Sequence, residues 1–202
     1  MILPASGNAP PTTISAAHRY LALFLPWMPT EQAIRAALAQ PDSPFALVQK
    51  QRGAMRIVAL SRRAADMGLE PGLALADVRG RVPELASVPH DPAADATLLD
   101  RLVRLAADYT PSAAPDPPQG VMLDITGCTH PWGGEAALCR ALSARIEALG
   151  FIVRSALADT PDAARALARF GGGEVRALPL AALAVGEETR TALRRAGFRT
   201  IG

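Results

Sequence analysis

The chain holds two cysteines and a histidine close together, and these are residue types that bind zinc. Cys128 and Cys139 lie eleven residues apart, and His130 follows the first of them. A structural zinc site uses four such ligands, so these three residues do not complete one. We therefore expect two reduced thiols in a cytosolic protein, with no metal or other cofactor at this loop.

Carboxylates are the other side chains that could do chemistry, because phosphoryl-transfer enzymes hold divalent metals between aspartates and glutamates. The apolar run 19–25 contains no acid, and the run 121–126 contains only Asp124. The sequence has no Gly-x-Ser-x-Gly run, no His-Glu-x-x-His run and no phosphate-binding P-loop, since Lys50 is its only lysine. Taken alone, these residues predict no catalytic centre.

The elements that position these side chains belong to a globular chain. Of the 202 residues, 50% are hydrophobic and 20% are charged, and the formal net charge is +2. This composition excludes a disordered chain, and no apolar run approaches the ~20 residues of a membrane span. Basic charge gathers in residues 163–202, which hold seven arginines against three glutamates. We interpret residues 1–18 as a flexible leader, because they lack the charged and apolar regions of a signal peptide.

Hydrophobic patterning predicts short strands that alternate with amphipathic helices. The expected strands are 19–25, 45–49, 55–60, 121–126 and 152–158. The expected helices follow the caps Thr30, Asp95, Gly134 and Thr160, with short helical pieces between 61 and 88. Residues 109–118 are expected to be a proline-rich connector, and 171–173 a linker to two short helices. This order predicts an α+β domain of the ferredoxin-like type, followed by a small helical module.

Five runs of the sequence together carry a family resemblance. These runs are RYLALFLP, VALSRRAADMGLEPGLALADVRGRVPEL, VMLDITG, ALADTPDAARALARFG and GFRTIG. Because corresponding runs occur there in the same order, residues 19–202 resemble the Y-family DNA polymerases. Each run is weak alone, and their order and spacing carry the resemblance. LALFLPW, LDITGC and ALADTP are similar in particular to the polymerase-like proteins of bacterial inducible mutagenesis cassettes.

The resemblance implies how the chain divides. A ferredoxin-like palm would occupy 19–60 and 89–170, with a small helical fingers insert at 61–88 and a helical thumb at 171–202. A little-finger domain and a clamp-binding tail would follow, and neither lies in these residues. We therefore expect either a fragment or a truncated homologue.

This sequence departs from active family members at the metal ligands. Active members carry D-x-D-x-F-F in the first strand, and the corresponding run here begins at Leu23, with leucine at both acid positions. Their other two ligands are the two acids of an S-I-D-E run. Counted back from Asp124 without a gap, these two positions are occupied here by Gln119 and Gly120. Asp124 lies ~13 Å from Gly120 along the strand, whereas paired metals lie ~4 Å apart. Asp124 therefore cannot rebuild the site.

The resemblance also identifies positions that would touch nucleotide or DNA. A tyrosine and an arginine that hold the incoming triphosphate in active members become Arg62 and Ala65. Residues 184–202 resemble the helix-hairpin-helix of the polymerase thumb, although Ala184 replaces its first glycine and Glu188 a basic residue. Non-specific, salt-sensitive contacts to DNA phosphates are expected from this segment. The predicted DNA-binding residues are Gly186, Thr189, Arg190, Arg194, Arg195 and Arg199.

These departures imply a pseudo-polymerase, a non-catalytic scaffold in DNA-damage-induced translesion synthesis and mutagenesis, cytoplasmic and associated with the nucleoid. It would link primer-template DNA to the sliding clamp, a RecA-like accessory protein and an error-prone replicative-type polymerase, mostly through C-terminal regions beyond these residues. Two alternatives stay open. One is an active Y-family polymerase with displaced metal ligands, for which Asp116 and Asp124 are the nearby candidates. The other is a truncated remnant that folds poorly.

Overall fold

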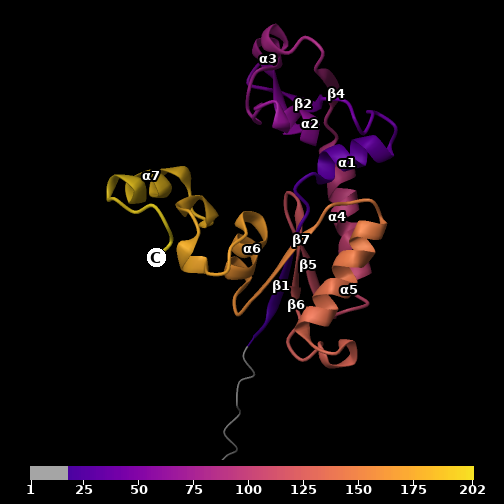
Figure 1. The fold of residues 1–202 in the computed structure, drawn as a ribbon, viewed down its shortest axis with the longest axis vertical. Helices are drawn as coiled ribbons and strands as arrows, with labels where there is room; N and C mark the ends of the chain where they lie inside the picture. The colour runs from indigo at the N-terminus through magenta and orange to yellow at the C-terminus, as the bar shows by residue number, and fades with distance from the viewer. Residues whose placement is uncertain (1–17) are drawn as a thin grey trace, which may run out of the picture.

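The computed structural model describes residues 18–202, so residues 1–17 of the predicted leader lie outside the described residues. Two β-sheets organise this part of the chain (Figure 1). The main sheet has the strand order β5-β6-β1-β7, and the second sheet has the order β3-β2-β4. The strands are β1 Tyr20–Phe24, β2 Phe45–Gln51, β3 Ala54–Leu60, β4 Ala86–Pro89, β5 Ser112–Asp116, β6 Gly120–Asp124 and β7 Arg154–Ala158.

Helices connect and cover these strands. The α-helices are α1 Met28–Arg35, α2 Arg62–Asp66, α3 Leu75–Arg81, α4 Pro92–Ala106, α5 Glu135–Ala148, α6 Pro161–Phe170 and α7 Glu187–Arg195. Three 3₁₀ turns accompany them, at His130–Trp132, Val175–Ala177 and Leu180–Ala182. Within the described residues, no helix combines the length and the apolar character that crossing a bilayer requires.

The main sheet confirms the predicted ferredoxin-like type. It is antiparallel throughout, because β6 and β7 flank β1 on either side and β5 pairs with the outer edge of β6. Taken in chain order as strands one to four, its members lie in the order 2-3-1-4, which is the ferredoxin-like order. Helices α4 and α5 lie on one face of the sheet and α6 on the other (Figure 1).

Side chains along β1 alternate between these two faces, as the pleat of a strand requires. Leu21 and Leu23 are buried with Leu142 of α5 in the larger core. Ala22 faces the other way and packs against Ala168 of α6. A residue's position in β1 therefore decides whether it belongs to the core or to the face beneath α6.

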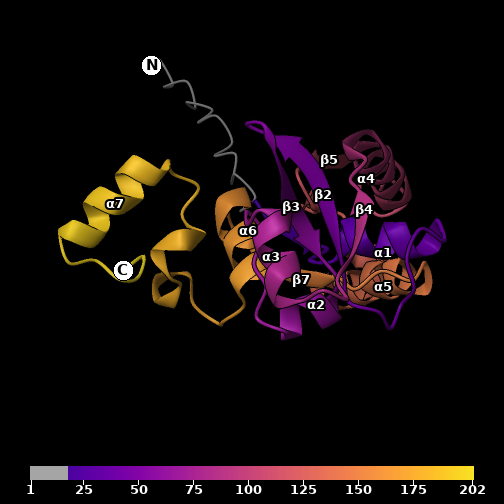
Figure 2. The ribbon, with the colours of Figure 1, turned by 90° about the horizontal axis from the view of Figure 1, so that it is seen from above.

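Residues 45–60 were expected in the palm sheet, and this expectation is wrong. They form β2 and β3, which turn at Gly53 and pair antiparallel, while β2 pairs in parallel with β4 on its other side. Residues 45–48 are all buried, as suits the central strand of a sheet packed against helices. The unit that carries α2 and α3 thus contains its own sheet and begins near residue 45, not at residue 61 (Figures 1 and 2).

The proline-rich connector predicted at 109–118 contains the edge strand β5. Pro115 lies within this strand, where its missing N–H is tolerated because an edge strand needs hydrogen bonds on one side only. The hairpin from β5 to β6 places Asp116 directly across from Gly120.

Helix α4 begins earlier than predicted. Its cap is Asp91, whose Oδ1 accepts hydrogen bonds from the backbone N–H of Ala93 and Ala94 at 3.0 and 3.1 Å. Asp95, the predicted cap, lies within the first turn and binds His90 instead, at 2.8 Å.

Residues 171–202 form a small unit beyond α6 (Figure 2). Only one of its two predicted helices is an α-helix, α7; the other is the 3₁₀ turn at 180–182. The end of the chain folds back along 178–180, where Pro179 bridges to Thr200 and Ile201 N–H donates to the Leu178 carbonyl at 3.0 Å. These bonds hold α7 and the segment after it to the rest of the unit.

Candidate functional site

One row of residues crosses the main sheet beneath α6, at the end where the predicted metal ligands lie. Cross-strand pairing places Asp116 of β5 opposite Gly120 of β6, Gly120 opposite Phe24 of β1, and Phe24 opposite Arg154 of β7. Residues paired in this way share one face of the sheet. We call these residues the α6-facing row. It lies on the face opposite the core that the sheet forms with α4 and α5, and we take it as the candidate position of a metal site.

Leu23, the predicted replacement of the first-strand metal ligand, does not belong to this row. Its side chain is 2% exposed and lies in the core on the opposite face, with its cross-strand partners Val121 and Ser155. The residue that faces α6 at this level is Phe24. A step of one residue along a strand exchanges the two faces, so Leu23 and Phe24 lie on opposite faces of the sheet.

Gly120, one of the two predicted replacements of the remaining metal ligands, is the first residue of β6, and Gln119, the other, directly precedes it. The Gln119 carbonyl accepts a hydrogen bond from Leu25 N–H at 2.8 Å, so this residue binds the sheet through its backbone. A Cβ at Gly120 would lie 2.9 Å from the Leu23 carbonyl oxygen and 3.0 Å from that of Asp116. Both neighbours are backbone atoms, so an acidic side chain at Gly120 requires the strands to move apart.

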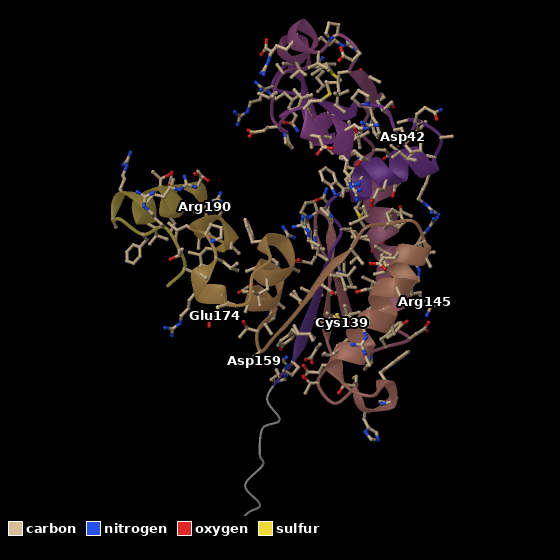
Figure 3. The ribbon with its side chains drawn as sticks, viewed as in Figure 1. Asp42, Cys139, Arg145, Asp159, Glu174 and Arg190 are labelled. Atoms are coloured by element: carbon tan, nitrogen blue, oxygen red, sulfur yellow. The ribbon has the colours of Figure 1, made fainter. Side chains whose placement is uncertain are left out.

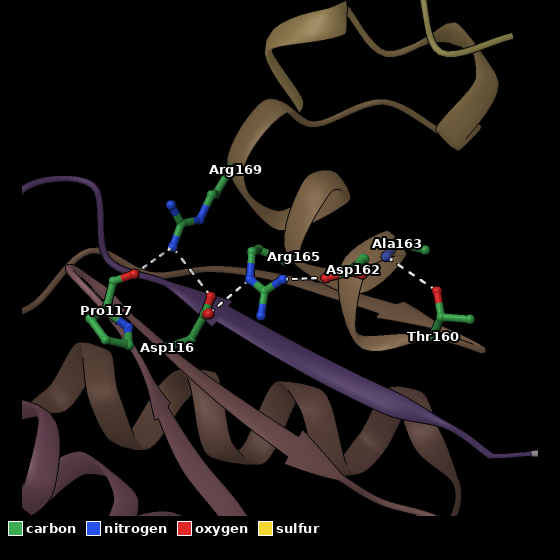
Figure 4. Close-up of polar contacts among 7 residues, drawn as sticks. All are labelled: Asp116, Pro117, Thr160, Asp162, Ala163, Arg165 and Arg169. Carbon is green, nitrogen blue, oxygen red and sulfur yellow. Dashed lines mark hydrogen bonds and ion pairs between the residues drawn. The ribbon is translucent and has the colours of Figure 1, made fainter. Parts of the chain in front are cut away.

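Asp116 is bound by two arginines from α6 (Figure 4). Arg165 Nε lies 2.8 Å from Asp116 Oδ1, and Arg169 Nη2 lies 3.2 Å from Oδ2. Arg165 also pairs with Asp162, one turn earlier on the helix. The guanidinium of Arg169 lies 5.3 Å from the centre of the Phe24 ring and donates to the Pro117 carbonyl. Both oxygens of Asp116 are therefore occupied by cationic groups.

The electrostatics of this Asp116–Arg165–Arg169 cluster favour the charged pair. The Asp116 side chain is only 12% exposed, and those of Arg165 and Arg169 are 29% and 25% exposed. Burial alone lowers the pKa of Arg165, but its hydrogen bonds to Asp116 and Asp162 outweigh that effect and raise the pKa overall. A carboxylate held in this way is a poor ligand for a divalent ion, because each guanidinium already supplies the opposite charge.

Asp124, the other candidate carboxylate, lies at the far end of β6, opposite Tyr20 and Ser112. It lies four positions after Gly120, which is about 13 Å along a strand. Asp124 Oδ1 accepts from Thr126 N–H at 2.9 Å, and His18 lies 3.4 Å from Oδ2. Hydrogen bonding from Thr126, followed by His18, lowers the pKa of Asp124. The two carboxylates do not converge, and residues 18–202 contain no group of three or more metal-ligating side chains.

The cysteine-containing loop is a structural turn. Cys128 approaches the hydroxyl of Thr110 at 3.7 Å, and Cys139 lies on α5 near Ser155, with Sγ and Oγ 3.1 Å apart (Figure 3). Trp132 of the same loop stacks on Tyr109, with ring centres 4.3 Å apart. Both thiols are free, as expected.

The two residues at the predicted triphosphate positions lie on α2, in the second-sheet unit. Arg62 is exposed and Ala65 is half-buried, and Ser61 caps the helix by accepting from Ala64 N–H. Glu31 of α1 lines the same pocket as Arg62, and its carboxylate accepts from Ile152 N–H at 3.2 Å. Burial raises the pKa of Glu31, and this hydrogen bond and the charge of Arg62 oppose the shift only in part.

The predicted DNA-binding residues gather on and after α7, away from the main sheet (Figure 3). Gly186 caps the helix and Thr189 is exposed on its first turn. Arg190 Nη2 lies 2.6 Å from Glu187, and Arg194 Nη1 lies 3.5 Å from the same carboxylate. Glu187 therefore pairs with both Arg190 and Arg194.

The remaining two arginines of this set, Arg195 and Arg199, are exposed. Within residues 18–202 neither forms an ion pair. The C-terminal unit therefore presents uncompensated positive charge to solvent.

Sequence comparison identifies the chain's relatives. Residues 28–169 match the model of the impB/mucB/samB family. Over 147 residues the chain is 42% identical to Protein ImuB of Caulobacter vibrioides (strain NA1000 / CB15N). That alignment covers 67% of this chain and 32% of ImuB, so the chain spans about a third of the length of this relative.

Structural comparison identifies the same fold in DNA polymerases. The insertion ternary complex of Dbh DNA polymerase superposes with a TM-score of 0.74 at 12% identity, over 90% of this chain and 58% of that one. DinB from Sulfolobus solfataricus superposes with a TM-score of 0.70 at 13% identity, over 91% and 58%. At these identities the likeness concerns the fold. With the match over residues 28–169, it confirms the Y-family resemblance: the chain belongs to the impB/mucB/samB family.

Proposed function

We propose that the chain is a non-catalytic, polymerase-like scaffold in DNA-damage-induced translesion synthesis. The observation that carries this proposal is the α6-facing row, in which the carboxylate of Asp116 is bound by Arg165 and Arg169 and is accompanied by Phe24 and Gly120. Two-metal catalysis of nucleotidyl transfer requires several carboxylates around a pair of metals ~4 Å apart. A row whose one carboxylate is bound by two arginines of α6 fits a structural role and not this chemistry.

Binding of primer-template DNA is the second part of the proposal. Support comes from the exposed arginines of the C-terminal unit and from the fold it shares with a polymerase solved as a ternary complex. Contacts to phosphates by arginine give affinity without sequence preference and weaken steeply with salt. Fluorescence anisotropy with labelled primer-template DNA at two salt concentrations tests this part. Salt-sensitive binding supports it, and an absence of binding at low salt contradicts it.

The remaining partners follow from the relationship to ImuB and belong to the proposal. They are the sliding clamp, a RecA-like accessory protein and an error-prone replicative-type polymerase that adds the nucleotides. We place the chain in the cytoplasm at the nucleoid, where these partners act.

Primer extension tests the absence of catalysis. The purified chain is incubated with primer-template DNA, nucleotides and either Mg²⁺ or Mn²⁺, with DinB from Sulfolobus solfataricus as the active comparison. We expect no extension by this chain with either metal, because its α6-facing row offers one carboxylate and that one is paired. Templated extension would instead support the alternative of an active Y-family polymerase with displaced ligands.

A further inference from the structure

Phe198 is an exposed aromatic side chain in the midst of positive charge. Its exposed fraction is 54%, against 44% for Phe170, the next most exposed phenylalanine among the described residues. The ring follows directly after the glycine turn that ends α7, in which Gly197 has a φ of 94° and Phe198 N–H donates to the Leu193 carbonyl at 3.1 Å. This arrangement is a Schellman C-cap, and such a cap normally covers the hydrophobic residue that follows the glycine. Here more than half of the surface of Phe198 remains exposed.

The ring borders a hollow of about 370 Å³ on the surface of the C-terminal unit. Pro179 and Leu180 form apolar parts of its wall, and Arg194 and Arg199 line it as well. An aromatic face and two guanidinium groups thus border one surface depression. The backbone there is fixed, because Leu180 N–H donates to the Arg199 carbonyl at 3.3 Å.

The arginines beside the ring are available to a ligand. Arg194 meets Glu187 at 3.5 Å, with both side chains more than half exposed, so water screens this pair. Arg199 forms no ion pair within residues 18–202. The combination of a flat apolar ring and exposed guanidinium groups suits a ligand that has both a flat aromatic face and negative charge. Single-stranded nucleic acid has both, one base and one phosphate per nucleotide.

We propose that this hollow binds single-stranded DNA, with one unpaired base stacked on Phe198 and the neighbouring phosphates at Arg194 and Arg199. A duplex does not fit this role, because its base faces are stacked on one another and are not accessible to a side chain. The inference rests on the proposed binding of DNA and adds that the C-terminal unit distinguishes an unpaired template segment from the duplex. Such a segment is present wherever synthesis has stopped at a lesion.

The test compares two fluorescein-labelled probes of equal length and charge, an oligothymidylate and an abasic oligonucleotide, in anisotropy titrations with the whole chain. The wild-type protein is expected to bind the oligothymidylate more tightly, because only that probe can stack. Phe198→Ala is expected to weaken this binding about tenfold and to leave the abasic probe unaffected, since stacking on one aromatic side chain contributes roughly 1–3 kcal/mol per base. Phe198→Tyr keeps a ring and should retain the preference, and Phe170→Ala is the matched control at the other exposed ring.

The outcomes separate this inference from the proposed function. If the wild-type chain binds neither probe nor duplex at low salt, the proposed DNA binding itself fails. If it binds both probes equally and Phe198→Ala changes nothing, DNA binding stands and the stacking site is refuted. If Phe170→Ala abolishes the preference instead, the site is elsewhere and the assignment of Phe198 is wrong. The double variant with Arg194→Gln and Arg199→Gln should bind both probes more weakly, and by the same factor. Unchanged affinity in that variant would also contradict the proposal.

Discussion

Replacing Asp116 by alanine tests the cluster that takes the place of a metal site. The substitution removes two charge-assisted hydrogen bonds, at 2.8 Å to Arg165 and 3.2 Å to Arg169. Such bonds contribute about 1.5–3 kcal/mol each when removed, and a partly exposed arginine loses less because water replaces the acceptor. Arg165 keeps Asp162, whereas Arg169 keeps only the Pro117 carbonyl and the Phe24 ring. We therefore expect a loss of about 2–3 kcal/mol in the free energy of unfolding.

Urea unfolding followed by circular dichroism measures this loss, and thermal unfolding should show a decrease of about 4–12 °C in Tm for a chain of this size. Asp162→Ala is the matched control, because that side chain is 82% exposed and its pair with Arg165 should contribute less than about 0.5 kcal/mol. In an Arg169→Met background, Asp116→Ala should lower the free energy of unfolding by clearly less, since one of the two partners of Asp116 is already absent. A loss for Asp116→Ala no larger than that for Asp162→Ala would refute the reasoning.

Three further predictions follow from the described contacts. Leu23→Asp places an unpaired carboxylate in the core, whereas the carboxylate of Phe24→Asp lies near Arg169. In urea unfolding, Leu23→Asp should therefore lower the free energy of unfolding by at least about 3 kcal/mol more than Phe24→Asp does. Equal losses would contradict the assignment of these two residues to opposite faces. Asp91→Ala removes the cap of α4 and should cost about 1 kcal/mol, with the exposed Asp100→Ala as its control on the same helix. Because burial raises the pKa of Glu31, the folded protein keeps that proton to higher pH than the unfolded chain does, and stability falls as pH rises from the ordinary glutamate pKa through the raised value. Glu31→Gln should remove this part of the slope in urea unfolding across mildly acidic pH, and an unchanged slope would show that Glu31 does not cause it.

Local patterns predicted the elements well where the signal lies within a short segment. Thr160 was expected to cap the helix after β7, and its hydroxyl does accept from Ala163 N–H at 3.3 Å. The order of strands and helices predicted the ferredoxin-like type of the domain, although the edge strand β5 lies in the segment predicted as a connector. The partner of a strand is not encoded in its own sequence, so residues 45–60 were assigned to the wrong sheet. The apolar residues of this segment would fit the centre of either of the two sheets.

The candidate site was harder to predict, because it depends on the face of a strand. The resemblance matched Leu23 to the first-strand metal ligand, whereas the side chain beneath α6 is that of Phe24, one residue later. The paired state of Asp116 was not predictable either, since Arg165 and Arg169 are 49 and 53 residues away in the chain. Two arginines four residues apart on one helix were the available signal, because that spacing places them on the same face.

The most direct test of the central claim is a titration of the purified chain with Mn²⁺, followed by electron paramagnetic resonance of the free ion. Because both oxygens of Asp116 are bound by arginine and no second carboxylate accompanies it in the α6-facing row, we expect the same free-ion signal as in buffer. Binding of one or two Mn²⁺ ions per chain that disappears in Asp116→Ala would contradict it, and would identify this row as a working metal site.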